Sequence, residues 1–257
     1  MDFGLRDKVI VVTEAAKDIG AAIALACGRE GAIPVILDRD ESGIRKLQDE
    51  LHQQDISSEA IPLEVTESPD CRRILEDLGR KFVHVDGVVN SFGLNSGCGL
   101  EHGSPQRFAS DLKSNLIRYY AVSQAMLPFL KRSRGSIVNV TSRIAFTEQG
   151  GASAYAAALG AIMEFTSDWA EELGQYGIRV NAVLPAEVTT PHYKERLHRP
   201  EKAIEDFRRI NATLSLNHQL TEPADIAAMT VFLLSAQSSG ITGQALFSER
   251  DYSQPTN

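Results

Sequence analysis

Short apolar runs alternate with longer segments of helical periodicity along most of this chain. The short runs are almost continuously apolar, whereas the longer segments place apolar residues three or four positions apart. This alternation is typical of βαβ units built around a buried parallel sheet. We therefore predict seven strands, at Lys8–Thr13, Ile33–Asp38, Glu59–Glu64, Asp86–Asn90, Ser136–Ser142, Ile178–Pro185 and Gln244–Phe247.

Three of the longer segments predict helices, because each has Ser, Asp or Pro near its start. They span Glu41–Gln54, Ser68–Phe82 and Ser104–Arg132. With right-handed crossovers, these elements predict an α/β fold: an open, doubly wound parallel sheet of the Rossmann type, in a single domain over residues 1–257. Ligands of such sheets bind outside the carboxyl ends of the strands, so the residues just after each run are the site candidates.

Composition narrows the possible partners. The chain of 257 residues carries 26 Lys and Arg against 34 Asp and Glu, a net charge of −8 without a basic block, which argues against nucleic acid. The three cysteines are widely spaced and the six histidines show no metal-ligand spacing, so we expect reduced thiols and no metal site. No apolar run reaches transmembrane length and the N-terminus lacks a signal-peptide pattern. We therefore expect a cytoplasmic protein with no membrane partner.

The ends of the predicted strands carry a series of motifs. In chain order they are TEAAKDIG at Thr13–Gly20, Asp38, NSFG at Asn90–Gly93, Asn115 within a helix, Ser142, Tyr155 and PAEVTTP at Pro185–Pro191. Tyr155 follows Ser142 by 13 residues. In this order and spacing the motifs resemble the short-chain dehydrogenase/reductase family over nearly the whole chain. The stretches NLIRYYAV and RVNAVLPAEVTTPHY resemble, more narrowly, bacterial sugar 1-dehydrogenases of the L-fucose dehydrogenase type.

This resemblance implies an oxidoreductase that transfers a hydride from a sugar or polyol hydroxyl carbon to NAD or NADP. It implies that Tyr155 is the base, that Ser142 orients the hydroxyl and that Asn115 supports the proton relay. The cofactor-binding positions that it implies are Thr13, Ile19, Gly20, Asp38, Asn90, Val188 and Thr190, and Glu187 is the candidate for substrate contact. It also implies a small-molecule substrate and a homo-oligomer, either a dimer or a tetramer.

Structural interpretations of the same residues stay open. Ser142 can be a strand-end cap, Tyr155 a packed aromatic side chain and Asn115 a residue that stabilises a helix kink. Asp38 favours NAD by accepting a hydrogen bond from a ribose 2′-hydroxyl, whereas Arg39 beside it could pair with the 2′-phosphate of NADP. Glu187 can equally face solvent.

The first departure from the family pattern concerns the base. The reference pKa of tyrosine, about 10, leaves it almost un-ionised at neutral pH, so a base of this type needs a cation nearby. The family has lysine four residues after the tyrosine, on the same helix face, but this chain has Leu159. Charges about 4 Å apart interact by roughly 4 kcal/mol at an effective dielectric constant near 20. We expect the rate to fall by several orders of magnitude.

Two further departures affect the cofactor loop and the C-terminal region. Two of the three family glycines in the loop are Glu14 and Asp18, whose charges should repel a pyrophosphate, and only Gly20 remains. The paired glycines near the C-terminus are Arg250 and Asp251. Two functions therefore stay open: an impaired NAD(P)-dependent oxidoreductase acting on a sugar or polyol, and a catalytically inactive family member that binds a small molecule or a partner.

Overall fold

All seven predicted strands occur in one parallel sheet of the computed structural model, which describes residues 2–146, 150–186, 188 and 221–248. The strands are β1 (Val9–Thr13), β2 (Ile33–Asp38), β3 (Glu59–Pro62), β4 (Gly87–Asn90), β5 (Ser136–Val140), β6 (Arg179–Leu184) and β7 (Ala245–Phe247). Their order in the sheet is β3-β2-β1-β4-β5-β6-β7. The predicted doubly wound α/β fold is therefore confirmed.

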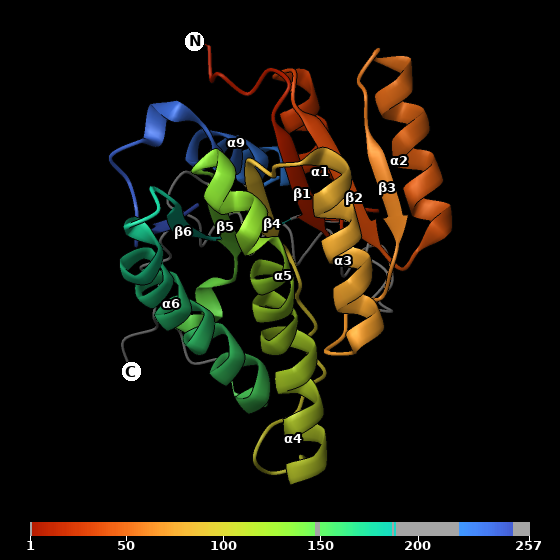
Figure 1. Cartoon of the computed structure of the whole chain (residues 1–257). Coiled ribbons are helices and arrows are strands. Elements are labelled where there is room, and N and C mark those ends of the chain that lie inside the picture. The colour runs from red at the N-terminus through yellow and green to blue at the C-terminus, as the bar shows by residue number, and fades with distance from the viewer. Residues whose placement is uncertain (1, 147–149, 187, 189–220, 249–257) are drawn as a thin grey trace.

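Helices cover both faces of the sheet (Figure 1). One face packs against α3 (Pro69–Phe82), α5 (Arg118–Ser133) and α6 (Ser153–Gly174). The other packs against α1 (Asp18–Arg29), α2 (Glu41–Gln53) and α9 (Pro223–Leu234). Each layer encloses its own apolar core, and this explains why the central strands are apolar on both faces. Among the described helices, none is both long and apolar enough to cross a lipid bilayer.

The predicted helix starts coincide with real N-terminal caps. The Asp40 carboxylate accepts hydrogen bonds from the backbone N–H groups of Ser42 and Gly43 at the start of α2. Ser68 accepts one from the N–H of Cys71 at the start of α3. These side chains satisfy N–H groups that have no acceptor within the helix. The predicted helix at Ser104–Arg132 consists of α4 (Pro105–Leu112), a π-helical segment at Lys113–Ile117, and α5.

A chain of buried polar side chains ties the central strands to the helices. The Asn90 Nδ2 donates to Ser123 Oγ at 3.0 Å and to Asn139 Oδ1 at 2.9 Å. The Asn139 Nδ2 in turn donates to Thr166 Oγ1 at 3.0 Å. All four residues are buried. Since unpaired polar groups are costly in a core, this chain specifies how β4, β5, α5 and α6 fit together.

The sheet reverses its order between β1 and β4, because β2 and β3 extend from one side of β1 and the later strands from the other. At such a reversal the loops that follow the two adjacent strands diverge and leave a crevice at the carboxyl edge of the sheet. The fold therefore positions its ligand site where the loops after β1 and β4 separate.

Helix α1 approaches the loop after β1 so closely that only glycine fits at position 20. A Cβ atom on Gly20 would lie 2.3 Å from the carbonyl oxygen of Glu14 and 2.9 Å from the Cα of Ala15. Backbone atoms cannot yield in the way that the end of a flexible side chain can. The retained glycine of the loop is therefore required by the packing of α1.

We predict that Gly20→Ala lowers the free energy of unfolding by about 1–3 kcal/mol, because the added methyl group overlaps backbone atoms. Gly160→Ala is the matched control: Gly160 lies within α6, and a Cβ atom there would meet nothing within 4 Å. The control should gain about 0.5–1 kcal/mol from the better helix propensity of alanine. Urea denaturation of both variants checks this, and equal effects at the two positions would contradict the packing argument.

Candidate functional site

A cleft of about 690 Å³ lies at the carboxyl edge of the sheet, where the strand order places a ligand site. The segments that follow β1 to β6 all contribute to its walls. Five predicted site residues line it: Ile19, Gly20, Asp38, Ser142 and Val188. Their cofactor or catalytic roles stay predictions, but the structure brings them to one cleft.

The loop after β1 keeps a glycine-like backbone at two positions that are no longer glycine. The φ angles of Glu14 and Asp18 are +47° and +52°, in the left-handed region. That conformation costs L-residues roughly 1–2 kcal/mol each. Lys17 is the N-cap residue of α1, and its side chain makes no capping hydrogen bond. The loop therefore retains its shape while acidic side chains enter the cleft.

Asp38, at the end of β2, organises this loop. Its Oδ2 accepts from the backbone N–H of Ala16 at 2.9 Å, and its Oδ1 accepts from the N–H of Asp40 at 2.9 Å. Both carboxylate oxygens thus accept a hydrogen bond from a backbone N–H group, although each retains a lone pair for a further donor. The predicted ribose contact would add to this structural role.

Thr13 and Asn90 lie behind the cleft wall and are not among its lining residues. The Thr13 hydroxyl accepts from the N–H of Ser91 at 2.9 Å and donates to the Val89 carbonyl at 3.3 Å. Asn90 is buried and engaged with Ser123 and Asn139. Thr13 thus fixes the loop after β4, and Asn90 joins β4 to α5 and β5, while the cofactor contacts predicted for both stay untested.

Ser142 lines the cleft, and Tyr155, on α6, lies behind the lining residue Gly93. The Ser142 Oγ accepts from the N–H of Ile144 at 3.3 Å and caps the 3-10 turn Arg143–Ala145, while Ser142 also lines the cleft. The Tyr155 hydroxyl lies 3.4 Å from the position that a Cβ atom would take on Gly93, another lining residue. The cap interpretation of Ser142 is therefore confirmed, and the catalytic roles of Ser142 and Tyr155 stay predictions.

Asn115 occupies the π-helical segment between α4 and α5. Its Oδ1 accepts from the N–H of Leu94 at 2.7 Å, and its Nδ2 donates to the carbonyls of Leu94 at 2.8 Å and Asp111 at 2.9 Å. A π-bulge adds one residue to a helical turn, which turns the amide toward the loop after β4. The helix-distortion interpretation is thus confirmed, and the relay role stays a prediction.

Leu159, one helical turn after Tyr155, is a core residue. It is 1% exposed and belongs to the apolar cluster that contains Phe92 and Tyr119. The Tyr119 hydroxyl lies 2.8 Å from the Phe92 carbonyl and 2.5 Å from that of Val140, where it donates a hydrogen bond. Burial, followed by the nearby Tyr155 and Glu14, raises the pKa of Tyr119 well above its usual value. Apolar packing therefore takes the position at which the family has its cation.

The sequence did not reveal a chain of ion pairs along the cleft. An Arg118 Nη1 lies 3.4 Å from Glu14 Oε1, and its Nη2 lies 3.2 Å from Glu64 Oε1, which is also 3.2 Å from Arg39 Nη1. We call these four residues the cleft ion-pair chain. Neither Arg118 nor Glu64 is among the predicted site residues, although Arg118 stands three residues after Asn115 and Glu64 ends the third predicted strand. Their contact could not be predicted from the sequence, because it joins segments that are far apart in the chain.

The Glu14 side chain is partly buried, with 43% of its surface exposed, and its pKa is raised. Desolvation raises the pKa of its carboxyl group, the Arg118 guanidinium opposes this shift, and the Asp38 carboxylate adds to it. A desolvated carboxylate between a cation and a second carboxylate is poorly placed to accept a third negative group. The loop is thus electrostatically unlike a phosphate cradle.

The cleft residues do not fit the pyrophosphate of a dinucleotide. Five carboxylates line the cleft, from Glu14, Asp18, Asp38, Asp40 and Glu64, against three cations, from Lys17, Arg39 and Arg118. Two of the carboxylates stand in the loop that opens α1, where a pyrophosphate would sit, and two of the cations belong to the cleft ion-pair chain. The adenosine side, with Asp38 and apolar walls, is better matched than the phosphate side.

Several predicted positions add little to this geometry. Val188 lines the cleft and pairs with Thr221 in an isolated parallel bridge. Glu187 and Thr190 lie outside the described residues, as do Arg250 and Asp251.

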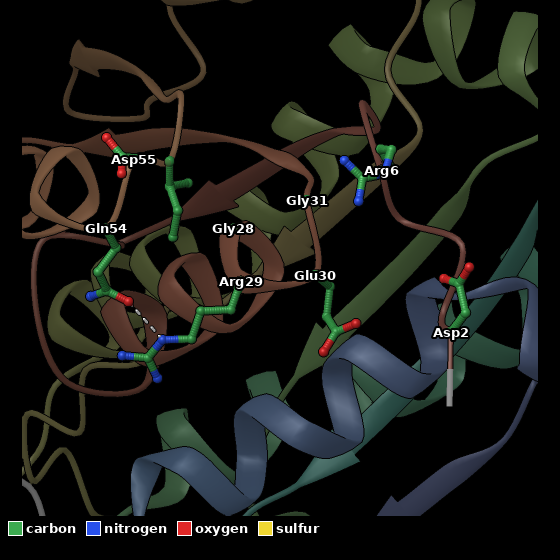
Figure 2. Close-up of a pocket in the computed structure, with 9 residues that line it drawn as sticks. Asp2, Arg6, Gly28, Arg29, Glu30, Gly31, Gln54 and Asp55 are labelled. Carbon is green, nitrogen blue, oxygen red and sulfur yellow. Dashed lines mark hydrogen bonds between the residues drawn. The ribbon is translucent and has the colours of Figure 1, made fainter.

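A second hollow, of about 520 Å³, lies at the opposite edge of the sheet (Figure 2). It is lined by residues that precede β1, β2 and β3, among them Arg6, Gly31 and Asp55. Arg29 on its wall donates to Gln54 at 2.9 Å. Because parallel sheets bind ligands at their carboxyl edge, the larger cleft is the better candidate site.

Comparison with known proteins agrees with this geometry. A family model described as enoyl-(acyl carrier protein) reductase matches residues 15–250. The chain is 36% identical to L-fucose dehydrogenase of Oryctolagus cuniculus over 244 residues, which cover 93% of this chain and 83% of the relative. It is 31% identical to 3-oxoacyl-(acyl-carrier-protein) reductase of Thermotoga maritima over 243 residues, covering 94% and 96%.

Two solved structures are similar over almost their whole length. The Cj0485 dehydrogenase superposes with a TM-score of 0.89 at 33% identity, covering 96% of this chain and 94% of that one. Aldohexose dehydrogenase of Thermoplasma acidophilum, in ligand-free form, has a TM-score of 0.85 at 28% identity, with coverage of 96% and 94%. The predicted likeness to sugar dehydrogenases is thereby confirmed.

We predict that the stability advantage of the wild type over Glu14→Gln decreases as the pH rises. The raised pKa means that the folded state holds a proton on Glu14 above pH 4.5, the ordinary value, where the unfolded chain has lost it. The contribution is thus fully present below pH 4.5 and is lost as the pH rises through the folded-state pKa. Urea denaturation of both proteins between about pH 4 and pH 7 checks this.

Glu76→Gln is the control with the opposite sign. Hydrogen bonding to Arg72 lowers the pKa of Glu76, so the wild-type advantage at this position should be present above pH 4.5 and disappear as the pH falls. Parallel pH trends for the two substitutions would contradict the assignment of Glu14 as a desolvated carboxyl group.

Proposed function

Because the chain belongs to the short-chain dehydrogenase/reductase family, we propose that it is a sugar- or polyol-binding member whose dehydrogenase reaction is reduced by several orders of magnitude. One observation carries the proposal: Leu159 is packed in the core one turn after Tyr155, at the position of the family's lysine. The protein then uses the Ser142–Tyr155 side of the cleft to hold a hydroxyl group.

The chemistry available to these residues is hydrogen bonding to a ligand hydroxyl. Ser142 and Tyr155 can each donate and accept, so together they can orient one hydroxyl group. Proton removal by Tyr155 would need a cation to favour the phenolate, and a leucine side chain contributes no such charge. Binding therefore survives the loss of lysine, whereas proton transfer does not.

The support for a sugar or polyol comes from the relatives. Their names state L-fucose and aldohexose as what they act on. In this chain the cleft combines carboxylates, the hydroxyl groups of serine and threonine, and apolar walls, a mixture that suits an uncharged polyhydroxy ligand. The substrate class is our inference from that combination.

Dinucleotide binding, if retained, should favour NAD over NADP. Asp38 is available to a ribose hydroxyl, and the Arg39 guanidinium is paired with Glu64 instead of being free for a 2′-phosphate. The carboxylates of Glu14 and Asp18 oppose the pyrophosphate of either cofactor.

A residual NAD-dependent oxidoreductase is the second candidate. The retained pair Ser142 and Tyr155 favours it, because the spacing of 13 residues between them is the one that the family's enzymes have. A cytoplasmic location and the absence of nucleic-acid and membrane partners are part of both candidates.

Titration and turnover measured on one preparation test the proposal. We expect L-fucose or another aldose to bind in calorimetry, Ser142→Ala to weaken that binding, and NAD reduction to be several orders of magnitude slower than with the rabbit L-fucose dehydrogenase assayed in parallel. No binding by a panel of aldoses would refute it. Turnover at the rate of the relative would refute the proposed impairment.

Leu159→Lys decides between the two candidates. Under residual dehydrogenase activity it should raise turnover, and Tyr155→Phe should abolish it; under the binding function, neither substitution creates or removes activity. Leu159→Met is the control, since methionine is unbranched like lysine and close to leucine in volume but carries no charge. Thermal unfolding of each variant is needed, because an ammonium group at a buried position destabilises the fold.

We also propose that the protein is a homo-oligomer, a dimer or a tetramer, assembled through α5 and α6. Tyr120 is 46% exposed and contacts Phe165 and Trp169, with ring centroids 6.5 and 6.2 Å away, and the latter two rings stack at 5.0 Å. An aromatic cluster of this kind suits the centre of an interface. Sedimentation velocity should give a mass at least twice that of the chain, and Tyr120→Glu should yield monomers; a monomeric wild type would refute this.

A further inference from the structure

The cleft ion-pair chain crosses the place where the sheet reverses its order. Glu14 follows β1, and Arg118 opens α5, which lies between β4 and β5 in the chain, after α4 and the π-helical segment. Their pair, with 3.4 Å between Nη1 and Oε1, therefore links the two sides of the crevice between β1 and β4. Both residues line the cleft. The pair stands within the region where a sheet of this type holds its ligand.

Arg118 is held more firmly than an ordinary surface arginine. Its side chain is only 20% exposed, and its guanidinium contacts carboxylates of both Glu14 and Glu64. The guanidinium carbon also lies 5.7 Å from the centroid of the Phe92 ring. A planar guanidinium fixed in this way inside a cleft presents the geometry that recognises phosphate and carboxylate groups alike.

Glu14 reaches this arginine at a cost to its own backbone. Its φ of +47° is one that glycine adopts freely and that glutamate does not. The backbone N–H of Gly93, on the far side of the crevice, also favours the charged form of the Glu14 carboxylate. A strained residue that persists with two partners on the opposite wall is a candidate for a specific role.

We propose that Arg118 is an anion-binding residue of this cleft and that the carboxylate of Glu14 fills the place that a phosphate group would otherwise take beside it. The protein thus supplies its own anion, and the nucleotide side of the cleft is closed to phosphate-bearing ligands. This proposal concerns the nucleotide side and does not depend on sugar binding at Ser142 and Tyr155.

The test is a calorimetric titration with ADP, and with adenosine as the phosphate-free probe. The wild type should not bind ADP at about 1 mM. Glu14→Gly frees Arg118 and should raise the affinity for ADP by at least roughly tenfold, with adenosine affinity unchanged. The double variant Glu14→Gly/Arg118→Ala should lose that gain, because the guanidinium is the group that binds the phosphate.

Two further variants keep the test decisive. Glu14→Gln removes the charge and keeps the side-chain length, so it should show a smaller gain of the same sign if Glu14→Gly fails to fold. Glu41→Gln, which breaks an exposed ion pair with Arg45 outside the cleft, should change nothing. Thermal unfolding confirms that each variant is folded.

Either of two results would overturn the proposal. One is micromolar ADP binding by the wild type, or a gain that persists in the double variant. The other is the absence of any gain in a folded Glu14→Gly or Glu14→Gln protein. Titration of the same variants with L-fucose separates this outcome from the proposed function, since loss of sugar binding leaves the ADP comparison intact.

Discussion

The close approach of α1 to the loop after β1 is the constraint on which the site depends. A Cβ atom on Gly20 would lie 2.3 Å from the carbonyl oxygen of Glu14, so the loop passes directly against the helix. In this loop the backbone is left-handed at positions 14 and 18. The chain therefore keeps the loop geometry of a dinucleotide fold, but it has glutamate and aspartate at two positions where the left-handed backbone is strained for any residue with a side chain.

The fold was predictable because its signals are local. Each apolar run became a strand within two residues of its predicted ends, and Asp40 and Ser68 cap helices where their sequence positions indicated. Parallel strands buried on both faces leave few other assignments for such runs. The π-helical segment at Lys113–Ile117 was not predicted, since its cause is tertiary: Asn115 bonds the loop after β4, over twenty residues away.

The site was only partly predictable from sequence. Sequence position placed Asp38 and Ser142 where strands end, and both line the cleft, whereas Tyr155 lies on α6 and the roles of all three stay predictions. It did not identify Arg118 as the partner of Glu14, 104 residues away, because no local pattern encodes a contact between side chains of separate segments. The sequence showed only that Leu159 stands where the family has a lysine. The structure shows that this leucine belongs to the apolar core.

Leu159 and Glu14, the two departures from the family pattern at the site, affect proton transfer and phosphate binding respectively, and they differ in their effect on stability. Replacing a lysine by Leu159 extends the core, so it is compatible with, and even favourable to, folding. Placing Glu14 in the loop strains the backbone and desolvates a carboxylate, so on stability alone it is unfavourable. The ion pair of Glu14 with Arg118 offsets only part of that cost, because pairs that are partly exposed to solvent contribute little. The ion pair is thus the feature of this cleft that stability alone does not explain, and it is the reason to regard the cleft as altered in specificity instead of simply decayed.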